Sequence, residues 1–269
     1  MRFFAILFTC TYKYNSAYDN KNKYFVINYH GNWDKVYEAL DKKEKNALEE
    51  LQNIEDKIAC QYLTILSSQY PAGLKTIYKP PFVIFYEGNI DLLKYSQKII
   101  AIIGSHYPNV YIKKVAKDMV QQLVNHQKIL ITSFNAGVEI LVHQLIKENN
   151  ISGNSVVIIN DSNNYDENQK ELVSYLKRYH LVISEYPLNM TRENISPVDS
   201  NVQRILLGLS KALLVLPFGD EKIVHSLVDI AFNENKDVFA VPNQIYEDFA
   251  TNNLIKNNAK LVQTIDDIL

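Results

Sequence analysis

The chain has 269 residues, of which 47% are hydrophobic and 22% are charged, and its formal net charge is -2. This length suggests one large domain, or one main domain with a smaller attachment, and the composition is that of a soluble globular protein. A uniformly basic protein is excluded, but a local basic groove is not, because nucleic-acid affinity depends on where Lys and Arg cluster. No apolar run reaches the roughly 20 residues that a membrane-spanning helix needs.

Cys10 and Cys60 are the only cysteines in the chain. Because they lie far apart and no His-rich segment accompanies them, they predict neither a zinc site nor a disulfide framework, and we expect reduced thiols in a cytoplasmic protein. The first residues, MRFFAILFTCTYKYN, contain an apolar run that resembles part of a secretory signal. Polar residues dilute the run and no small-residue cleavage site follows, so we interpret it as a strand.

Residues 1–68 are expected to form a small α+β extension whose role the sequence does not indicate. The stretches 3–14 and 23–30 have strand patterns, and the apolar residues within 32–66 keep roughly helical spacing. A segment with three prolines follows, in which FVIFYEG is a short strand. It leads into a larger unit over residues 69–269.

From Lys98 onward, strand and helix patterns alternate. Several strands are continuous apolar runs, such as IIAIIG and ALLVL, which is typical of strands buried on both faces of a parallel sheet. The pattern predicts an α/β fold with a doubly wound, Rossmann-like, mostly parallel sheet. The expected strands are 99–104, 128–132, 154–159, 180–184, 212–216 and 237–241. The expected helices are 110–125, 136–148, 167–179, 200–210 and 223–234.

Ligands of such sheets bind beyond the carboxyl ends of the strands. One predicted end is Gly104-Ser105, followed by His106. A glycine there lets the backbone approach a phosphate, and exposed N–H groups and a serine hydroxyl can receive it. The alternative is that Gly104 only permits a tight turn. The other predicted ends are Thr132-Ser133, Ser184-Glu185 and Pro217-Phe218.

Seven short blocks, in order and at similar spacing, resemble the DNA-processing protein A family (DprA, also called Smf). The resemblance covers about residues 69–269 and is loose before them. Each block alone is weak, and their common order carries the resemblance. The blocks are QYPAGLKTIYKPPFVIFYEGNIDLL, IIAIIGSHY, ILITSFNAGVEILVHQ, LVISEYP, QRILLGLSKALLVL, KDVFAVPN and NLIKNNAKLV.

The resemblance implies a non-enzymatic cytoplasmic protein that binds single-stranded DNA, forms homodimers and passes incoming DNA to a RecA-type recombinase during natural transformation. It implies no cofactor, no metal and no membrane partner. Together with the strand-end argument, it makes eight residues candidates for DNA binding. These are Gly104, Ser105, His106, Thr132, Ser133, Gly137, Lys170 and Arg204.

This chain departs from the family pattern at several candidate positions. His106 stands where the family has Arg, so a permanent positive charge is missing there. Thr132-Ser133 replaces Ser-Gly, and Glu139 replaces Asp. In the Arg-Asn-Arg block only Arg204 remains. These departures predict weaker DNA binding on an unchanged fold.

Some candidates have simpler explanations. Arg204 could hold a phosphate as a fork, but it could also pair with a carboxylate at the surface. Lys170 has acidic neighbours that weaken its field. The pairs Lys113-Lys114 and Lys177-Arg178 are best explained as solvated helix faces.

Aromatic and histidine residues have similar alternatives. Tyr107, Tyr111, Tyr165 and Tyr186 follow strand ends and could stack on unpaired bases, but tyrosines also cover half-buried surfaces. Glu139 and His143, four residues apart, share a helix face, where a buried structural histidine is favoured over a metal site.

Two other functions remain open. A scaffold that has lost DNA binding but keeps a protein interface would fit the altered cleft residues. A Rossmann-like nucleotide phosphoribohydrolase is disfavoured, because LPFGDEKIVHSL contains one glycine where that motif needs several. A dinucleotide enzyme is disfavoured too, because no Gly-x-Gly-x-x-Gly occurs.

Overall fold

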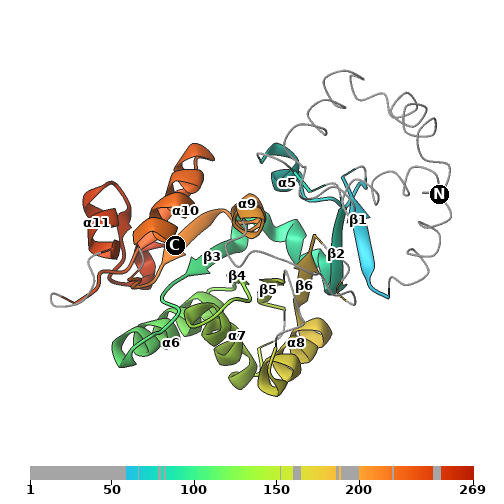
Figure 1. Ribbon diagram of the computed structural model, residues 1–269, viewed down its shortest axis with the longest axis horizontal. Helices are drawn as coiled ribbons and strands as arrows, with labels where there is room; N and C mark the ends of the chain where they lie inside the picture. The colour runs from blue at the N-terminus through green and yellow to red at the C-terminus, as the bar shows by residue number, and fades with distance from the viewer. Residues whose placement is uncertain are drawn as a thin grey trace.

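The fold is known from a computed structural model, shown in Figure 1 with the element labels used below. It describes residues 59–65, 67–77, 80–81, 83–151, 153–159, 165–185, 188, 200–219, 221–244 and 250–269. The strands expected at 3–14 and 23–30 lie outside the described residues, as does most of the helix expected within 32–66. Among the described residues, no helix is both long and apolar enough to span a membrane.

The described residues build a nine-stranded sheet in the order β1-β2-β6-β5-β4-β3-β7-β8-β9. β1 pairs antiparallel with β2, and β2 pairs antiparallel with β6, while all other pairs are parallel. The prediction of a doubly wound, mostly parallel Rossmann-like sheet is therefore confirmed. The strands are β1 Gln61–Thr64, β2 Val83–Gly88, β3 Ile99–Ile103, β4 Ile129–Ser133, β5 Ser155–Ile158, β6 Leu181–Ser184, β7 Ala212–Val215, β8 Asp237–Ala240 and β9 Lys260–Leu261.

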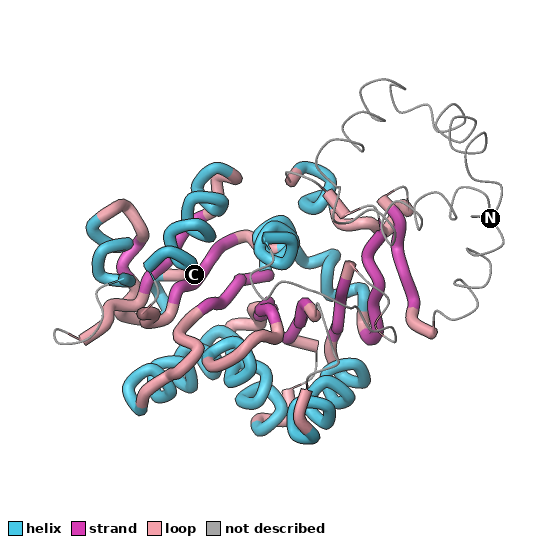
Figure 2. The backbone as a smooth tube through the Cα atoms, viewed as in Figure 1, coloured by secondary structure: helices cyan, strands magenta, loops and turns pink. Residues whose placement is uncertain are grey.

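Helices cover both faces of this sheet (Figures 1 and 2). α6, α7 and α8 lie on one face, whereas α9 and α10 lie on the other. The helices are α5 Ala72–Thr76, α6 Val110–Asn125, α7 Val138–Glu148, α8 Glu167–Tyr179, α9 Ser200–Leu209, α10 Glu221–Asn233 and α11 Ala250–Lys256, with 3-10 segments η2 Ile90–Lys98 and η3 Ile265–Asp267. All five helices expected from the alternating pattern are present, within two residues of their expected bounds.

The sequence-based reading was wrong at one described element. Helical spacing was expected to continue through residues 61–66, yet Gln61–Thr64 is strand β1. Every residue of β1 pairs with β2, from Gln61 with Tyr86 to Thr64 with Val83. Tertiary pairing with an existing sheet edge therefore overrides the local helical pattern. The division of the chain after Ser68 stays a prediction.

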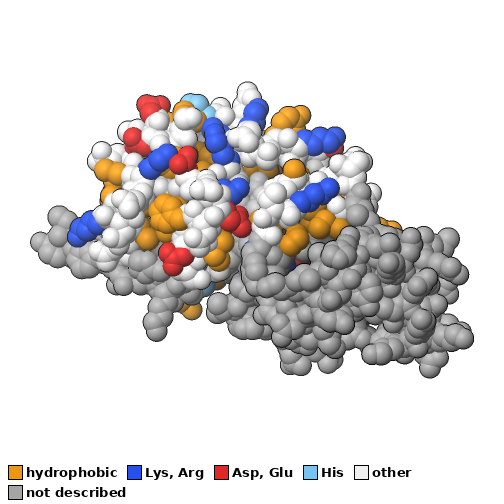
Figure 3. Space-filling view, turned by 90° about the horizontal axis from the view of Figure 1, so that it is seen from above, with side chains coloured by type: hydrophobic (Ala, Val, Ile, Leu, Met, Phe, Trp, Pro, Cys, Tyr) orange, Lys and Arg blue, Asp and Glu red, His pale blue; other side chains and the backbone are white. Residues whose placement is uncertain are grey.

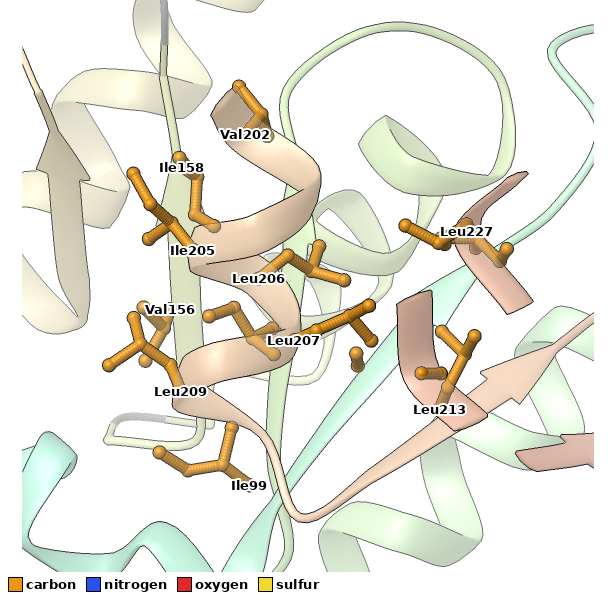
Figure 4. Close-up of a cluster of buried hydrophobic side chains, with 14 of the residues drawn as sticks. Ile99, Val156, Ile158, Val202, Ile205, Leu206, Leu207, Leu209, Leu213 and Leu227 are labelled. Atoms are coloured by element: carbon orange, nitrogen blue, oxygen red, sulfur yellow. The ribbon is translucent and has the colours of Figure 1, made fainter. Parts of the chain in front are cut away.

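Apolar side chains from both faces of the sheet form the core, because its central strands are buried on both sides. β3, β4 and β5 have no exposed residue. Figure 4 shows how α9 packs: Ile205 and Leu209 lie over Val156 and Ile158 of β5, and Leu207 points toward β7. The core thus holds the strand ends in fixed positions relative to one another.

The strand order reverses at β3, which lies between β4 and β7. From β3 the chain proceeds outward through β4, β5 and β6, and then returns to the other side of β3 as β7. The connections after β3 and β7 lead to α6 and α10, on opposite faces of the sheet (Figure 1). In open α/β sheets, such a reversal opens a crevice at the carboxyl ends of the strands, where ligands bind.

Candidate nucleic-acid interface

Gly104, Ser105 and His106 form a corner directly after β3, at this reversal point. The corner is hydrogen-bonded to the segment that follows β7. Ser105 donates its backbone N–H to the carbonyl oxygen of Pro217, at 3.3 Å. The ring of His106 meets the ring of Phe218 edge to face, with centroids 6.2 Å apart. Gly104 is buried, Ser105 is half-buried and His106 is exposed. The corner therefore presents its serine and histidine at the carboxyl end of β3, beside the segment that follows β7.

Two glycines let the start of α7 press against this corner. A Cβ on Gly104 would lie 2.8–2.9 Å from side-chain atoms of Val138. Gly137 has a φ of +62°, and a Cβ there would lie 2.2 Å from the carbonyl oxygen of Ser105. Val138 donates its backbone N–H to that same oxygen, at 3.0 Å. The predicted corner Gly104-Ser105-His106 and Gly137, which was predicted from a separate block, are thus neighbours.

Thr132 and Ser133, the other predicted pair of polar residues, lie inside the protein. The Thr132 hydroxyl is 2.7 Å from Nε2 of His143 and the Ser133 hydroxyl donates to Glu139. Because both hydroxyls already have internal partners on α7, their observed role is to link β4 to α7. Direct DNA contact by these two residues stays a prediction.

His143 and Glu139 belong to this buried network. Nδ1 of His143 is 2.7 Å from the hydroxyl of Ser155, and burial lowers the pKa of His143 to about 3, so its ring is neutral. Burial raises the pKa of Glu139 to about 7, against the opposing hydrogen bonds from Ser133 and Asn135. The favoured explanation of His143 as a buried structural histidine is confirmed. No cluster of three or more metal-ligating side chains occurs in the part of the chain that the structure describes.

Arg204 lies in α9 and is buried, with its Nη2 paired to the carboxylate of Glu185 just after β6. The alternative of a carboxylate partner is therefore the one observed, although the pair lies inside the protein and not at its surface. Nε and Nη1 of Arg204 are also buried and have no hydrogen-bond partner among the described residues. Glu185 balances the charge of Arg204, and a phosphate contact by Arg204 stays a prediction.

Comparison with known proteins agrees with the fold. The profile of the family described as DNA recombination-mediator protein A matches residues 61–269. The chain belongs to this family. The resemblance to DprA/Smf proteins is thereby confirmed, and the match begins at the first residue of β1.

Curated members of the family are similar over most of this chain. The DNA processing protein DprA of Streptococcus pneumoniae is 29% identical over 211 residues, covering 77% of this chain and 72% of that protein. The DNA processing protein DprA of Bacillus subtilis is 28% identical, covering 77% and 69%. The solved structure of the Streptococcus pneumoniae protein has a TM-score of 0.69 and 26% identity, covering 82% of this chain and 80% of that one.

A second solved structure, DNA processing protein A of Helicobacter pylori, has a TM-score of 0.64. It is 20% identical and covers 78% of this chain and 94% of that one, so the likeness concerns the fold.

Lys170, in the second turn of α8, is exposed and pairs with Glu167 at 2.8 Å. Both side chains are more than half exposed, so solvent screens this pair and it holds Lys170 only weakly. Glu167, one of the acidic neighbours in the sequence, is thus the observed partner of Lys170, and the weakening of its field stays a prediction. The structure provides no contact between Lys170 and the corner.

The tyrosines that follow strand ends differ in their surroundings. Tyr107 is 92% exposed, whereas Tyr111 is half-buried and its hydroxyl donates to the carbonyl oxygen of Pro242 at 3.0 Å. Tyr165 packs against Phe134, with ring centroids 5.0 Å apart. Tyr186 lies outside the described residues. Among the three tyrosines described, only Tyr107 offers an open ring face to a ligand.

Sequence reasoning missed three members of the site. Asn135 donates to the Ser133 hydroxyl at 2.9 Å, Phe218 packs on His106, and Glu185 pairs with Arg204. Glu185 and Phe218 were available as predicted strand ends, but nothing in the sequence linked them to their partners.

A pocket of about 370 Å³ lies elsewhere, between α5, η2 and the end of α9, and contains none of the eight candidates.

Proposed function

We propose that this chain is a recombination mediator of the DprA type, which binds single-stranded DNA without catalytic turnover. The observation that carries the proposal is the corner of Gly104, Ser105 and His106, which lies at the sheet reversal and packs against Gly137. A glycine-permitted backbone and a serine hydroxyl at a strand end suit a phosphate group. A structurally similar family member, from Helicobacter pylori, is described by its single-stranded DNA binding mode.

The proposed partner of the DNA-bound protein is a RecA-type recombinase, to which it would pass incoming DNA during natural transformation. The family description, DNA recombination-mediator protein A, supports this part of the proposal. We further propose that the chain acts as a homodimer in the cytoplasm, so that the binding groove extends across two subunits. A mediator of this kind must hold phosphates while it leaves the bases free to pair.

The first test is fluorescence anisotropy with a labelled single strand of about 20 nucleotides, at low and moderate salt, with a duplex of the same sequence as control. Phosphate-driven binding loses affinity steeply as salt rises. Salt-sensitive binding that prefers the single strand is expected. Absence of binding by the folded protein at low salt would contradict the proposal.

The two partner proposals need separate measurements. Light scattering coupled to gel filtration should give twice the chain mass of 31.0 kDa for a homodimer. Loading of RecA onto single strands coated with single-strand-binding protein should be faster in the presence of this protein. A monomer in the first measurement, or an unchanged rate in the second, would contradict that part of the proposal alone.

A second candidate, a scaffold that keeps only a protein interface, is favoured by two observations. The corner has His106 where the resemblance to the family implies an Arg, and the Arg204 charge is balanced by Glu185. The scaffold predicts an unchanged dimer and unchanged recombinase contact with no salt-sensitive DNA binding. The anisotropy measurement therefore distinguishes the two candidates.

A further inference from the structure

The segment after the corner, from Tyr107 to the first residue of α6, carries the two most exposed large hydrophobic side chains in the described part of the chain. Tyr107 is 92% exposed and Val110 is 85% exposed, while the next, Tyr95 on η2, is 55% exposed. Single exposed hydrophobic residues are ordinary on protein surfaces. Two of them within four residues, directly beside the candidate site, indicate a surface that meets a ligand.

The backbone beneath Tyr107 is held in place although the ring is open to solvent. The Ser105 hydroxyl accepts the backbone N–H of Tyr107 at 3.1 Å, which fixes the turn. Two residues later, the Asn109 side chain accepts the backbone N–H of Ile112 at 2.9 Å and caps α6. An ordered support for an exposed ring lowers the entropy that is lost when the ring stacks on a ligand.

A basic stripe continues from this loop along α6. Positions three and four apart share one face of a helix, so Val110, Lys113, Lys114 and Lys117 form one stripe. All four are exposed, and the opposite face, with Ile112, Ala116, Met119 and Val120, is buried against the sheet.

The lysines of this stripe are available for a ligand. None of the three forms a salt bridge with a carboxylate within the described residues, in contrast to Lys94, Lys147, Lys170, Lys177 and Lys260. The neighbouring Asp118 accepts a hydrogen bond from Gln122 at 3.0 Å. The face seen in Figure 3 differs, because there Lys and Arg side chains are scattered among Asp and Glu. The α6 stripe therefore has three exposed lysines without a salt-bridge partner among the described residues, with Asp118 as the one carboxylate beside them on the helix.

We propose that Tyr107 stacks on an unpaired base and that Lys113, Lys114 and Lys117 contact phosphates of the same strand. The DNA would leave the Gly104-Ser105 corner along the exposed face of α6. This inference rests on the proposed function and adds residues that would make binding selective for single strands. A duplex hides its base faces inside its stack, so Tyr107 can contribute only when bases are unpaired, whereas the lysines act on any phosphate backbone.

The test of stacking compares Tyr107→Ala, Tyr107→Phe and the control Tyr95→Ala in the anisotropy measurement. Tyr107→Ala should weaken single-strand binding by roughly 5- to 150-fold, which is the range of one lost base–aromatic stack. Tyr107→Phe keeps the ring and should bind like the parent protein. Tyr95 is exposed but lies just before β3, at the opposite end of this strand from the corner, so Tyr95→Ala should have no effect.

The test of the stripe uses a triple Lys113→Gln, Lys114→Gln, Lys117→Gln variant. Its plot of log affinity against log salt should be shallower by about 2, because each phosphate contact to a single strand contributes about 0.7 to the slope. The matched control, Lys94→Gln with Lys98→Gln on η2, should keep the parent slope. Circular dichroism should show parent-like folding for all variants, because every substituted side chain is exposed.

These outcomes separate the inference from the function on which it rests. If the parent protein does not bind single strands, the proposed function fails and the inference fails with it. If the parent binds, but Tyr107→Ala matches Tyr95→Ala or the triple variant keeps the parent slope, the path along α6 is wrong while the function stands. A strand in which every nucleotide is abasic should bind the parent and Tyr107→Ala equally well, because it offers no base to stack on.

Discussion

Arg204 and Glu185 form an ion pair inside the protein, although one lies within α9 and the other follows β6. The pair links α9 to the carboxyl end of β6, which lies next to β5 in the sheet. Removing one charge of such a pair leaves the other buried and uncompensated.

Arg204→Ala should therefore lower the free energy of unfolding by about 3 to 5 kcal/mol. Urea denaturation at neutral pH measures this change. Replacing both residues, by Arg204→Met with Glu185→Leu, should cost less than Arg204→Ala alone, because no buried charge is then left. An equal or larger loss in the double variant would show that the charges themselves are not the cause.

Gly137 is predicted to be required for both stability and DNA binding. Gly137→Ala combines a positive φ with a Cβ at 2.2 Å from the carbonyl oxygen of Ser105, so the corner must move. Gly153→Ala is the matched control, since Gly153 also has a positive φ but a Cβ there would touch nothing within 4 Å. The control should cost about 1 to 2 kcal/mol, and Gly137→Ala should cost more. Only Gly137→Ala should weaken single-strand binding, and equal binding by both variants would contradict the site.

His106→Arg should strengthen DNA binding, because it adds a permanent charge at an exposed position of the corner. One charge-assisted hydrogen bond corresponds to roughly tenfold tighter binding at low salt, and the salt slope should steepen by about 0.7. Gln97→Arg adds the same charge at an exposed position of η2, before β3 and away from α6, and should change neither quantity. Unchanged or weaker affinity for His106→Arg in the anisotropy assay would remove His106 from the site.

Glu139 should make stability fall as pH rises. Its pKa is raised from 4.5 to about 7 in the folded protein, so between these values the folded state holds a proton that the unfolded state has lost. The free energy of unfolding therefore decreases as pH rises from 4.5 to 7, by about 3 kcal/mol at most. Above pH 7 this contribution is constant.

Glu139→Gln removes this titration. Relative to the parent, the variant should therefore gain stability from pH 5 to pH 8, measured by urea denaturation at each pH. Glu148→Gln, at an exposed position of the same helix, should not reproduce the gain. The buried His143 has the opposite effect in both parent and variant, since its lowered pKa makes stability fall as pH drops below 6.5. A constant difference between parent and Glu139→Gln across pH would contradict the prediction.

Local patterns determined most of the Rossmann-like unit. Strands such as Ile99–Ile103 and Ala212–Val215 are short apolar runs that only burial on both faces can satisfy, and the helices between them have one apolar face each. Because these signals lie within single elements, element type and order could be predicted without knowledge of the fold. The glycine and serine of the corner could be predicted for the same reason.

Tertiary structure alone decided which of these residues meet. Gly137 touches Ser105, and Arg204 finds Glu185, through contacts between segments that the sequence keeps apart. Tyr107 is exposed to solvent, whereas the hydroxyl of Tyr111 is hydrogen-bonded to Pro242, although both residues follow the same strand. Residues 61–64 form a strand because they pair with β2. Periodicity reports the environment of one element, whereas burial, charge pairing and exposure at this site depend on how several elements pack together.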